Sequence, residues 1–414
     1  MLNRRKFTGL LGAAALPLPA YAASIPPFYA STGPLLTQFD LDVGAATLTR
    51  RGAVTLPANL QYAWPHPSGK FLYACASNSQ PPSGPVGVAG GDKNHYAIAY
   101  AIGADGALGE HGERRLLSHR PLHITTDGKF LFITYNNPSQ ITVHRLNGDG
   151  SIGDEVPQPA GLDFAIYAHQ VRLTPGGKTL TLCARGNDAT ATTPEDPGHI
   201  QVFGITDGRL SNLQSLAPHG QGLGFGPRHL DFSPDGRFVY VSLERQNSLC
   251  VYGLNADGTL GAEPLFMKNT LLDPDGKAKH FGQTAGPIHV HPGGRFVYQT
   301  NRGSGTIDVD GKKVWNGGEN SVAVWKIDRM TGEPTRIQNA PAHGFELRTF
   351  TIDPSGKVLI AASTTPLMLP DGGTVSAGLS VWRIGADGKL TFARKYDADT
   401  KAGIQFWCGL LTMP

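Results

Sequence analysis

The 414-residue sequence predicts an all-β fold, a seven-bladed β-propeller with four-stranded antiparallel blades, from two repeated segments and their spacing. The first segment is an apolar strand, a tight turn that contains Gly-Lys or Gly-Arg, and a second apolar strand. A hairpin cannot bury its apolar face alone, so its repetition indicates stacked units with a shared core. The period leaves room for about four strands per unit, as in a propeller blade. Six turn glycines, 49 to 62 residues apart, mark the copies: Gly69, Gly128, Gly177, Gly236, Gly294 and Gly356.

The second segment is a strand of alternating apolar and polar residues followed by a glycine-containing turn. Its alternation is typical of a strand with one buried face. Seven copies begin at Leu36, Ala97, Ile141, Ile200, Leu249, Val322 and Leu379. The first segment forms the inner hairpin of each unit, and its seventh copy is expected to be irregular and to use IQFWCGLLT near the C-terminus. The N- and C-terminal strands are therefore expected to share one blade and close the ring, which leaves few unpaired sheet edges.

The repeats are not divided by any linker-like segment, so residues 23–414 are expected to form one domain. Four long insertions rich in Gly and Pro are expected to be loops, and loops of this length on a rigid scaffold often carry function. They run from Gln80 to His95, Arg185 to Gly198, Asn269 to Gly286, and Gly303 to Glu319.

Residues 1–22 have the pattern of an export signal, with a basic start, an apolar run and Ala20-Tyr21-Ala22 as a cleavage site after Ala22. Arg4-Arg5 resembles a twin-arginine signal, which implies passage through the Tat translocon and a periplasmic location. Asn3 stands where that pattern usually has Ser or Thr, and an ordinary secretory signal is the alternative. The apolar run is too short for a retained membrane anchor.

Removal of this segment leaves a chain with balanced charge. The whole sequence has 36 Lys and Arg against 33 Asp and Glu; the signal holds three bases and no acid, so the remainder has 33 of each. An even mixture of charges argues against nucleic acid or an anionic membrane as partner. The cysteines lie in separate apolar strands and are expected to be buried free thiols, without metal or redox use; a disulfide formed in an oxidising compartment is the alternative. They are Cys75, Cys183, Cys250 and Cys408.

Polar residues flank the inner hairpins at the ends that should surround the central channel, because the first strand leads to the turn and the second returns from it. Imidazoles, guanidiniums and a carboxylate converging on one channel mouth are expected of a site that handles an anion or an ester. These residues are Gln61, Tyr62, Ser77, His123, Tyr135, His169, Arg185, Arg228, His229, Glu244, Arg245, His289, Asn301, Arg302, Glu346 and Arg348.

The segment GPRHLDFSPDGRFVYVSLE, from Gly226 to Glu244, resembles the signature of the seven-bladed lactonase family. That family includes bacterial 6-phosphogluconolactonase of the propeller type and fungal carboxy-muconate cyclase. AHQVRLTPGGK around His169 and HVHPGGRFVYQTNRG around Arg302 fit the same pattern. The resemblance implies that the catalytic residues are His169, Arg228, Glu244 and Arg302.

The sequence departs from the family pattern at the ends of two inner hairpins, Cys75-Ala76-Ser77-Asn78 and Cys183-Ala184-Arg185-Gly186. These differences are expected to change which substrate is preferred rather than which reaction is catalysed. Arg185 adds a base near the site, and a surface salt bridge is an equal interpretation.

Hydrolysis of a lactone, a cyclic ester, needs a deprotonated water and a group that stabilises charge on the carbonyl oxygen. His169 or Glu244 would act as the base, and Arg228 and Arg302 would bind the oxyanion or the substrate's polar groups. No Gly-x-Ser-x-Gly segment is present, which disfavours an acyl-enzyme. The residues expected to bind substrate are His123, Tyr135, Arg185, His229, His289 and Asn301.

The sequence favours an exported lactonase acting on a sugar lactone such as glucono-1,5-lactone, because a phosphorylated lactone is made in the cytoplasm. No cofactor is expected. No metal ion is expected either, because the predicted channel mouth is poor in the acidic ligands that hard cations prefer. A muconate-type cyclase, a 6-phosphogluconolactonase and a non-catalytic binding propeller remain alternatives. The pair Glu244 and Arg228 is alternatively a structural ion pair that fixes a blade.

Overall fold

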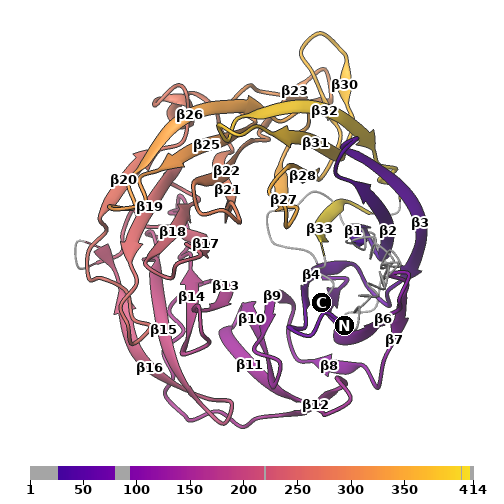
Figure 1. The fold of residues 1–414 in the computed structure, drawn as a ribbon. Helices are drawn as coiled ribbons and strands as arrows, with labels where there is room; N and C mark the ends of the chain where they lie inside the picture. The colour runs from indigo at the N-terminus through magenta and orange to yellow at the C-terminus, as the bar shows by residue number, and fades with distance from the viewer. Residues whose placement is uncertain (1–26, 80–93, 219–220, 402, 411–414) are drawn as a thin grey trace, which may run out of the picture.

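The computed structural model describes residues 27–79, 94–218, 221–401 and 403–410. It forms a ring of seven antiparallel sheets, the blades, arranged around a common axis (Figure 1). This arrangement confirms the predicted seven-bladed propeller. The predicted signal at residues 1–22 lies outside the described residues.

The blades are numbered around the ring, and the strands of each are given from the axis outward. Blade 1 contains β33 (Gln405–Leu410), β1 (Pro27–Thr32), β2 (Leu35–Asp42) and β3 (Thr47–Thr55). Blade 2 contains β4 (Leu60–Pro65), β5 (Phe71–Ser77), β6 (His95–Ile102) and β7 (Leu108–Glu110), with β8 (Arg115–Leu117) also paired to β6. Blade 3 contains β9 (Pro121–Thr126), β10 (Phe130–Asn136), β11 (Ser139–Leu146) and β12 (Ile152–Glu155).

Blade 4 contains β13 (Ala168–Leu173), β14 (Thr179–Ala184), β15 (His199–Thr206) and β16 (Arg209–Leu216). Blade 5 contains β17 (Pro227–Phe232), β18 (Phe238–Leu243), β19 (Ser248–Gly253) and β20 (Phe266–Asn269). Blade 6 contains β21 (Gln283–Val290), β22 (Phe296–Gly303), β25 (Ser321–Ile327) and β26 (Pro334–Pro341). Blade 7 contains β27 (Leu347–Ile352), β28 (Val358–Ser363), β31 (Gly378–Ile384) and β32 (Leu390–Asp397).

The two ends of the described chain meet in blade 1, as the sequence predicts. Strand β33 pairs antiparallel with β1, with Ala30 opposite Cys408. On its other sides β33 contacts β27 of blade 7 and β4 of blade 2, and every innermost strand contacts the next one around the ring. The shared blade therefore joins the last blade to the first.

The expectation of loops is wrong for two of the four insertions. The segment from Gly303 to Glu319 contains β23 (Thr306–Val309) and β24 (Lys312–Trp315), and the segment from Asn269 to Gly286 contains α1 (Gly276–Lys279). Strand β24 pairs with β29 (Leu367–Met368) of blade 7, which pairs in turn with β30 (Thr374–Val375). Together they form a small accessory sheet that projects from the ring (Figure 1).

Asp310 and Gly311 explain the unexpected hairpin between β23 and β24. Both residues have positive φ, 52° and 74°, which suits a two-residue turn between antiparallel strands. The segment from Arg185 to Gly198 is a loop, as expected, and most of the insertion after Gln80 lies outside the described residues.

A repeated contact between neighbouring blades, which we call the inter-blade latch, explains the recurring Gly-Lys/Arg-Phe-x-Tyr sequence. The Phe ring lies directly under the glycine of the next blade's outer turn, and the Tyr hydroxyl donates to that glycine's carbonyl oxygen. In blade 5, a Cβ added at Gly332 would lie 2.6 Å from the ring of Phe238, and Tyr240 donates to the Gly332 carbonyl at 3.2 Å. Tyr73 and Gly150, and Tyr298 and Gly388, form the same hydrogen bond at 2.9 Å.

The latch also explains why the aromatic residues of the repeats are core residues. Phe238 and Tyr240 of blade 5 pack in one apolar cluster with Ile288, Val297 and Trp325 of blade 6. The four cysteines are buried and unpaired, which agrees with the expectation of free thiols.

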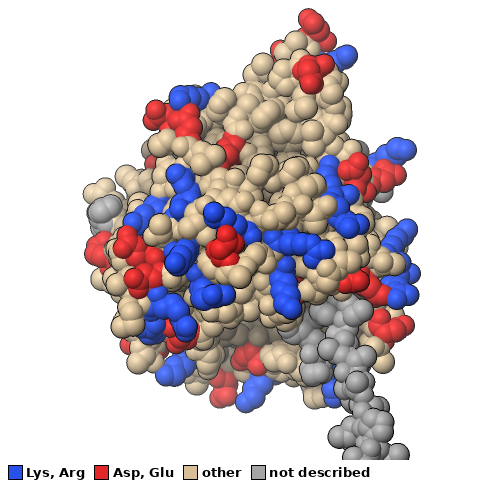
Figure 2. Space-filling model, turned by 45° about the horizontal axis from the view of Figure 1, so that its top comes forward, with Lys and Arg blue, Asp and Glu red and all other residues tan. Residues whose placement is uncertain are grey.

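The described surface carries mixed charge. On the face shown in Figure 2, basic and acidic side chains are interspersed, which agrees with the balanced composition of the chain. In the described part of the chain, none of the helices has the length and apolar character needed to cross a lipid bilayer.

The latch predicts that a side chain added at an outer-turn glycine strongly lowers the free energy of unfolding. Gly332→Ala should lower the free energy of unfolding by about 2 kcal/mol more than Gly161→Ala, because overpacking adds to backbone strain. Both glycines have a φ of 79°, and a Cβ at Gly161 meets nothing within 4 Å, so Gly161→Ala is a matched control for backbone strain. Tyr240→Phe should cost about 1 kcal/mol. Urea unfolding measures the free energy of unfolding of all three variants. Equal losses of stability in the two glycine variants would contradict the latch.

Candidate active site

Every innermost strand has a β-bulge near the same end of the propeller axis. The pairing register with the second strand shifts at one or two residues that have no direct partner, as in a β-bulge, and a bulge re-aims a side chain. The extra residues are Gln61 in β4, Leu122 in β9, His169 in β13, Arg228 in β17, Gly286 and Pro287 in β21, Arg348 in β27, and Phe406 and Trp407 in β33.

These bulge residues build the pocket at that end of the axis. Six of them line it, and the residue that follows the bulge does so in four strands. The lining residues are Gln61, Tyr62, Leu122, His123, His169, Arg228, His229, Arg348, Thr349 and Phe406. The pocket thus draws on blades 1, 2, 3, 4, 5 and 7.

Three neutral imidazoles form one wall of this pocket. The ring of His229 lies 5.1 Å from that of His169 and 6.3 Å from that of His123, measured between centroids. Burial, followed by the charge of nearby arginines such as Arg228, lowers the pKa of all three well below 6.5. They are therefore uncharged at neutral pH.

Several nitrogens of these imidazoles are buried without a hydrogen-bond partner. They are Nδ1 of His169, Nε2 of His229 and both ring nitrogens of His123. The Gln170 amide donates to Nδ1 of His229 at 3.1 Å, which leaves the His229 proton on Nε2. Buried polar atoms are rarely left unpaired in a protein interior, so these nitrogens are suited to a bound polar molecule.

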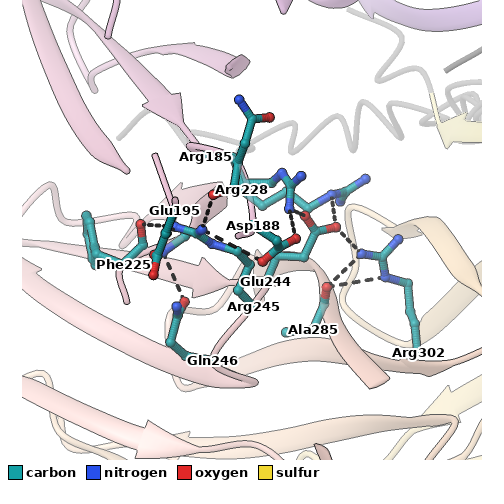
Figure 3. Close-up of polar contacts among 12 residues, drawn as sticks. Arg185, Asp188, Glu195, Phe225, Arg228, Glu244, Arg245, Gln246, Ala285 and Arg302 are labelled. Carbon is teal, nitrogen blue, oxygen red and sulfur yellow. Dashed lines mark hydrogen bonds and ion pairs between the residues drawn. The ribbon is translucent and has the colours of Figure 1, made fainter. Parts of the chain in front are cut away.

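Glu244 is the centre of a cluster of buried ion pairs beside the imidazoles (Figure 3). One carboxylate oxygen, Oε1, contacts Nε of Arg228 at 2.9 Å and also accepts from Arg302, while Oε2 lies 3.2 Å from Nη1 of Arg185. Burial would raise the pKa of this carboxyl, but the charges of Arg228, Arg302 and Arg185 lower it to about 2.

A second carboxylate, Glu346, extends the cluster into blade 7. Its Oε1 accepts from Nη1 of Arg302 at 2.5 Å and lies 3.7 Å from Nη1 of Arg348. Ser304, in the insertion that forms part of the accessory sheet, donates to Oε2 at 2.8 Å. Arg302 is thereby held between two carboxylates and is only 2% exposed.

Gly286 makes room for Arg302 in blade 6. A Cβ at this position would clash with Oγ1 of Thr300 and would lie 3.2 Å from Nε of Arg302. The guanidinium of Arg302 instead donates to the carbonyl oxygen of Ala285, from Nη2 at 2.8 Å. Blade 6 contributes its arginine, Arg302, from β22, whereas blades 5 and 7 contribute Arg228 and Arg348 from the bulge of the innermost strand.

Arg245 fixes the loop from Arg185 to Gly198 against the site (Figure 3). Its Nη1 donates to the Asn187 carbonyl oxygen at 2.8 Å, and its Nη2 lies 3.0 Å from Oε1 of Glu195. Arg185 sits at the start of this loop and stacks on Tyr167, with 4.6 Å between the guanidinium carbon and the ring centroid.

The structure brings most of the predicted site residues together. His123, His169, Arg228 and His229 line the pocket, and the ion pairs of Glu244 join Arg185 and Arg302 to Arg228. His289 does not line the pocket; its Nδ1 contacts Asp231 at 3.4 Å.

Tyr135 and Asn301 are not brought to the pocket, contrary to their expected role in substrate binding. Tyr135 is fully buried in a core cluster, and its hydroxyl is 2.9 Å from Oγ1 of Thr142. The amide of Asn301 is satisfied by Thr270, which directly follows β20 of blade 5, and by Ser321 in β25 of blade 6. Neither side chain lines the pocket, because both are packed between neighbouring blades.

Glu346 and Arg348 were expected at the channel mouth but were given no catalytic or substrate-binding role, and Phe406 was not expected there. Arg348 occupies the same position as Arg228, the second residue of an innermost strand. Comparison of the repeats at this position is the signal that could have identified it. Phe406 has no such signal, because its strand is separated from its blade partners by almost the whole chain.

The described residues contain no cluster of three or more His, Cys, Asp or Glu side chains with a geometry suited to a metal ion. The two carboxylates nearest the pocket, Glu244 and Glu346, are both engaged by arginines.

A family model described as lactonase, 7-bladed beta-propeller, matches residues 24–365. The chain belongs to this family. Membership identifies it as a lactone-hydrolysing enzyme, a hydrolase of carboxylic esters. The resemblance noted in the sequence is therefore confirmed at the level of family and reaction class.

Individual relatives cover most of the chain. The 6-phosphogluconolactonase of Cronobacter sakazakii is 31% identical over 326 residues, which are 76% of this chain and 80% of the relative. The 6-phosphogluconolactonase of Erwinia tasmaniensis is 25% identical over 360 residues, 83% of this chain and 88% of the relative. The structure of the Pseudomonas aeruginosa periplasmic gluconolactonase shares the fold, with a TM-score of 0.68, 18% identity, and coverage of 94% of this chain and 99% of that one.

The ion pairs of Glu244 with three arginines predict that the protein loses stability in acid. Its folded-state pKa of about 2 lies below the ordinary value of 4.5, so its contribution is present above about pH 4.5 and is lost as pH falls toward 2. The free energy of unfolding should fall by about 3 kcal/mol over this range through Glu244.

Urea unfolding between pH 6 and pH 2 measures this loss. Glu244→Gln should be less stable near neutral pH, because it leaves buried arginines without their partner, and should show a shallower pH dependence. The exposed carboxylate Glu113, changed to Gln, is a matched control. Identical pH dependence in Glu244→Gln and the unchanged protein would contradict the assignment.

Proposed function

We propose that this protein is an exported lactonase that hydrolyses a sugar lactone of the glucono-1,5-lactone type without a metal ion. The observation that carries the proposal is a pocket in which a buried, neutral imidazole with an unpartnered nitrogen, His169, lies beside an arginine with an unpartnered nitrogen, Arg228. A base and an oxyanion donor in one pocket are what ester hydrolysis requires.

In this proposal His169 is the general base. It removes a proton from water as the water oxygen attacks the lactone carbonyl carbon, and the carbonyl oxygen becomes an oxyanion. The bond between that carbon and the ring oxygen then breaks, and the imidazolium returns the proton to the departing ring oxygen. The products are one open-chain hydroxy acid and an unchanged enzyme. The lowered pKa of His169 keeps it in the basic form at neutral pH.

Arg228 is proposed to bind the oxyanion. Glu244 holds its Nε at 2.9 Å, while Nη1 is buried without a partner and is available to a substrate. Burial, followed by the charge of Arg302, lowers the Arg228 pKa to about 9, so the guanidinium is a cation whose charge is incompletely compensated. A developing negative charge on the substrate would stabilise it.

Glu244 is proposed to position arginines rather than act as base. Both of its carboxylate oxygens are already engaged by Arg228, Arg302 and Arg185, whereas Nδ1 of His169 has no partner. This geometry supports His169 over Glu244 as the base. His229, with its proton on Nε2, would donate to a substrate oxygen.

Export and the choice of an unphosphorylated lactone rest on residues 1–22, with their twin-arginine pattern and the Ala20-Tyr21-Ala22 site. The structural neighbour named periplasmic gluconolactonase is consistent with this location and substrate. A second candidate, 6-phosphogluconolactone, is supported by the names of the relatives and by the surplus of arginine over carboxylate around the pocket.

Purified protein should hydrolyse glucono-1,5-lactone above the spontaneous rate with EDTA present. Arg228→Ala should lower kcat about 10²- to 10³-fold, the usual effect of removing one oxyanion donor. Arg209→Ala, an exposed arginine on the outer strand β16, is the matched control and should keep full activity. Loss of activity with EDTA alone, or full activity of Arg228→Ala, would contradict the proposal.

The pH dependence of kcat/KM tests the base. The rate requires unprotonated His169, so it should be lost as pH falls through the depressed pKa of His169, and the acid limb should lie below pH 6.5. His169→Asn should lower kcat about 10²- to 10⁴-fold and remove that limb. A limb unchanged in position in His169→Asn would assign the base to another group.

A further inference from the structure

We propose that Gln170 is a positioning residue that makes the imidazole of His229 a hydrogen-bond donor to the substrate and leaves His169 as the proton acceptor of the pair. This inference rests on the proposed function and deepens it, because it explains how two imidazoles of one pocket take opposite roles. Gln170 directly follows the bulge residue His169 in β13, and its side chain reaches His229 in β17. These two innermost strands are neighbours in the ring (Figure 1).

The backbone of β17 fixes which way round the Gln170 amide lies. The N–H of Leu230 donates to Oε1 of Gln170 at 2.6 Å. A backbone N–H can only donate, so the atom that faces it is the amide oxygen, and the NH2 group therefore faces Nδ1 of His229, 3.1 Å away. An NH2 group can also only donate, so Nδ1 accepts with its lone pair. The single proton of the neutral imidazole then lies on Nε2, which is buried without a partner.

The same connection between a side chain and the next innermost strand recurs in the ring. Oδ2 of Asp231 in blade 5 accepts from the N–H of Val290 in blade 6 at 2.9 Å. Oγ1 of Thr349 in blade 7 accepts from the N–H of Cys408 in blade 1 at 2.9 Å. An innermost strand has no sheet partner on its axial side, so these side chains satisfy N–H groups that the sheet leaves free. In blade 4 a carboxylate would make the same backbone contact, but it would offer the imidazole an acceptor instead of a donor.

The surroundings of His229 favour its neutral form. Burial, followed by the charge of Arg228, lowers the pKa of His229 well below 6.5. The nearby carboxylates are already paired, Glu244 with three arginines and Asp231 with Arg172 at 2.9 Å. Neither ring nitrogen of His229 contacts a carboxylate. The titratable and charged groups around this imidazole are Arg228 and Asp231 of β17, His169 and Arg172 of β13, His123 of β9, His289 of β21, Glu244 after β18, and Arg348 of β27.

Gln170 thereby removes His229 as a competitor for the role of base. A general base needs a free lone pair, and the one lone pair of this neutral ring is occupied by the amide. Nδ1 of His169 has no partner, and the two rings lie 5.1 Å apart between centroids, so both imidazoles can contact one ester group. A neutral imidazole can polarise a carbonyl as a hydrogen-bond donor. His169 would accept the proton of water while Nε2 of His229 donates to a substrate oxygen.

The pH dependence of kcat/KM in Gln170→Glu tests this role. The carboxylate still accepts from the Leu230 N–H, but it presents an acceptor to Nδ1 and raises the pKa of His229. Below that raised pKa the imidazolium still donates through Nε2; above it the remaining proton lies on Nδ1 and the donor is lost. The rate should therefore fall about 10²- to 10³-fold as pH rises through this pKa, the effect of removing one oxyanion donor. The unchanged protein should keep its rate until Arg228 loses its charge, at a pKa of about 9.

Gln170→Met separates the effect on the imidazole from support of the backbone. Methionine has a similar volume, but it bonds neither to the Leu230 N–H nor to Nδ1 of His229. It should lower kcat about 10-fold, the effect of one hydrogen bond, and should add no alkaline limb. If Gln170 only held the backbone, Gln170→Met would be harmful and Gln170→Glu would keep the pH profile of the unchanged protein. That result would overturn the proposal.

Gln338→Glu is the matched control, because Gln338 uses its amide in the same way outside the pocket. In β26 its Nε2 donates to the carbonyl oxygen of Leu390 at 2.9 Å, and its Oε1 accepts from the Leu390 N–H at 2.7 Å. The control should lower stability without moving either limb of the pH profile. An alkaline limb of the same size in Gln338→Glu would contradict the role of Gln170.

Nitrogen NMR of the histidine side chains separates this inference from the proposed function, because it needs no turnover and begins with the unchanged protein. His229, assigned by the loss of its signals in His229→Asn, should show a protonated Nε2 and an unprotonated Nδ1 at neutral pH. In Gln170→Glu, Nδ1 should become protonated. This pattern in a protein that hydrolyses no lactone would sustain the control of His229 by Gln170 and reject the lactonase. A proton on Nδ1 of His229 in the unchanged protein would reject that control.

Discussion

The contact between an outer-turn glycine and the aromatic residues of the preceding blade is the constraint on which the rest of the structure depends. It sets the distance and the angle between blades, because the Phe ring fills the space that any side chain at the glycine would need, and the Tyr hydroxyl fixes the glycine carbonyl. With blades fixed in this way, the bulges of the innermost strands all fall at one end of the axis. A pocket assembled from six blades requires such a rigid frame, because each blade contributes only one or two side chains.

Within that frame, the carboxylate of Glu244 organises the charges. Burying several guanidiniums in one place is costly unless carboxylates compensate them, and Glu244 and Glu346 do so only in part. The remaining positive field has two consequences for the chemistry. Together with burial, which is the larger cause, it lowers the pKa of the neighbouring imidazoles and keeps them neutral, and it attracts the negative charge that develops on a reacting carbonyl oxygen.

The repeats made the fold predictable, whereas the direction of individual side chains was not. The number of blades and the shared terminal blade follow from segments visible in the chain, and so does the proximity of His169, Arg228, Glu244 and Arg302. Tyr135 and Asn301 lie near the correct strand ends but are buried between blades, since one residue of offset places a side chain on the other face of the sheet. The bulge that re-aims Arg348 has no mark in local sequence and emerges only when the seven innermost strands are compared.

The proposed mechanism requires a lactone to bind with its carbonyl group between His169 and Arg228. A crystal structure with glucono-1,5-lactam, an analogue with an amide in place of the ester, tests this most directly. We expect the lactam carbonyl oxygen within hydrogen-bond distance of the Arg228 guanidinium, and room for one water between the carbonyl carbon and the His169 imidazole. A lactam bound with its carbonyl directed away from Arg228, or bound outside this pocket, would contradict the account.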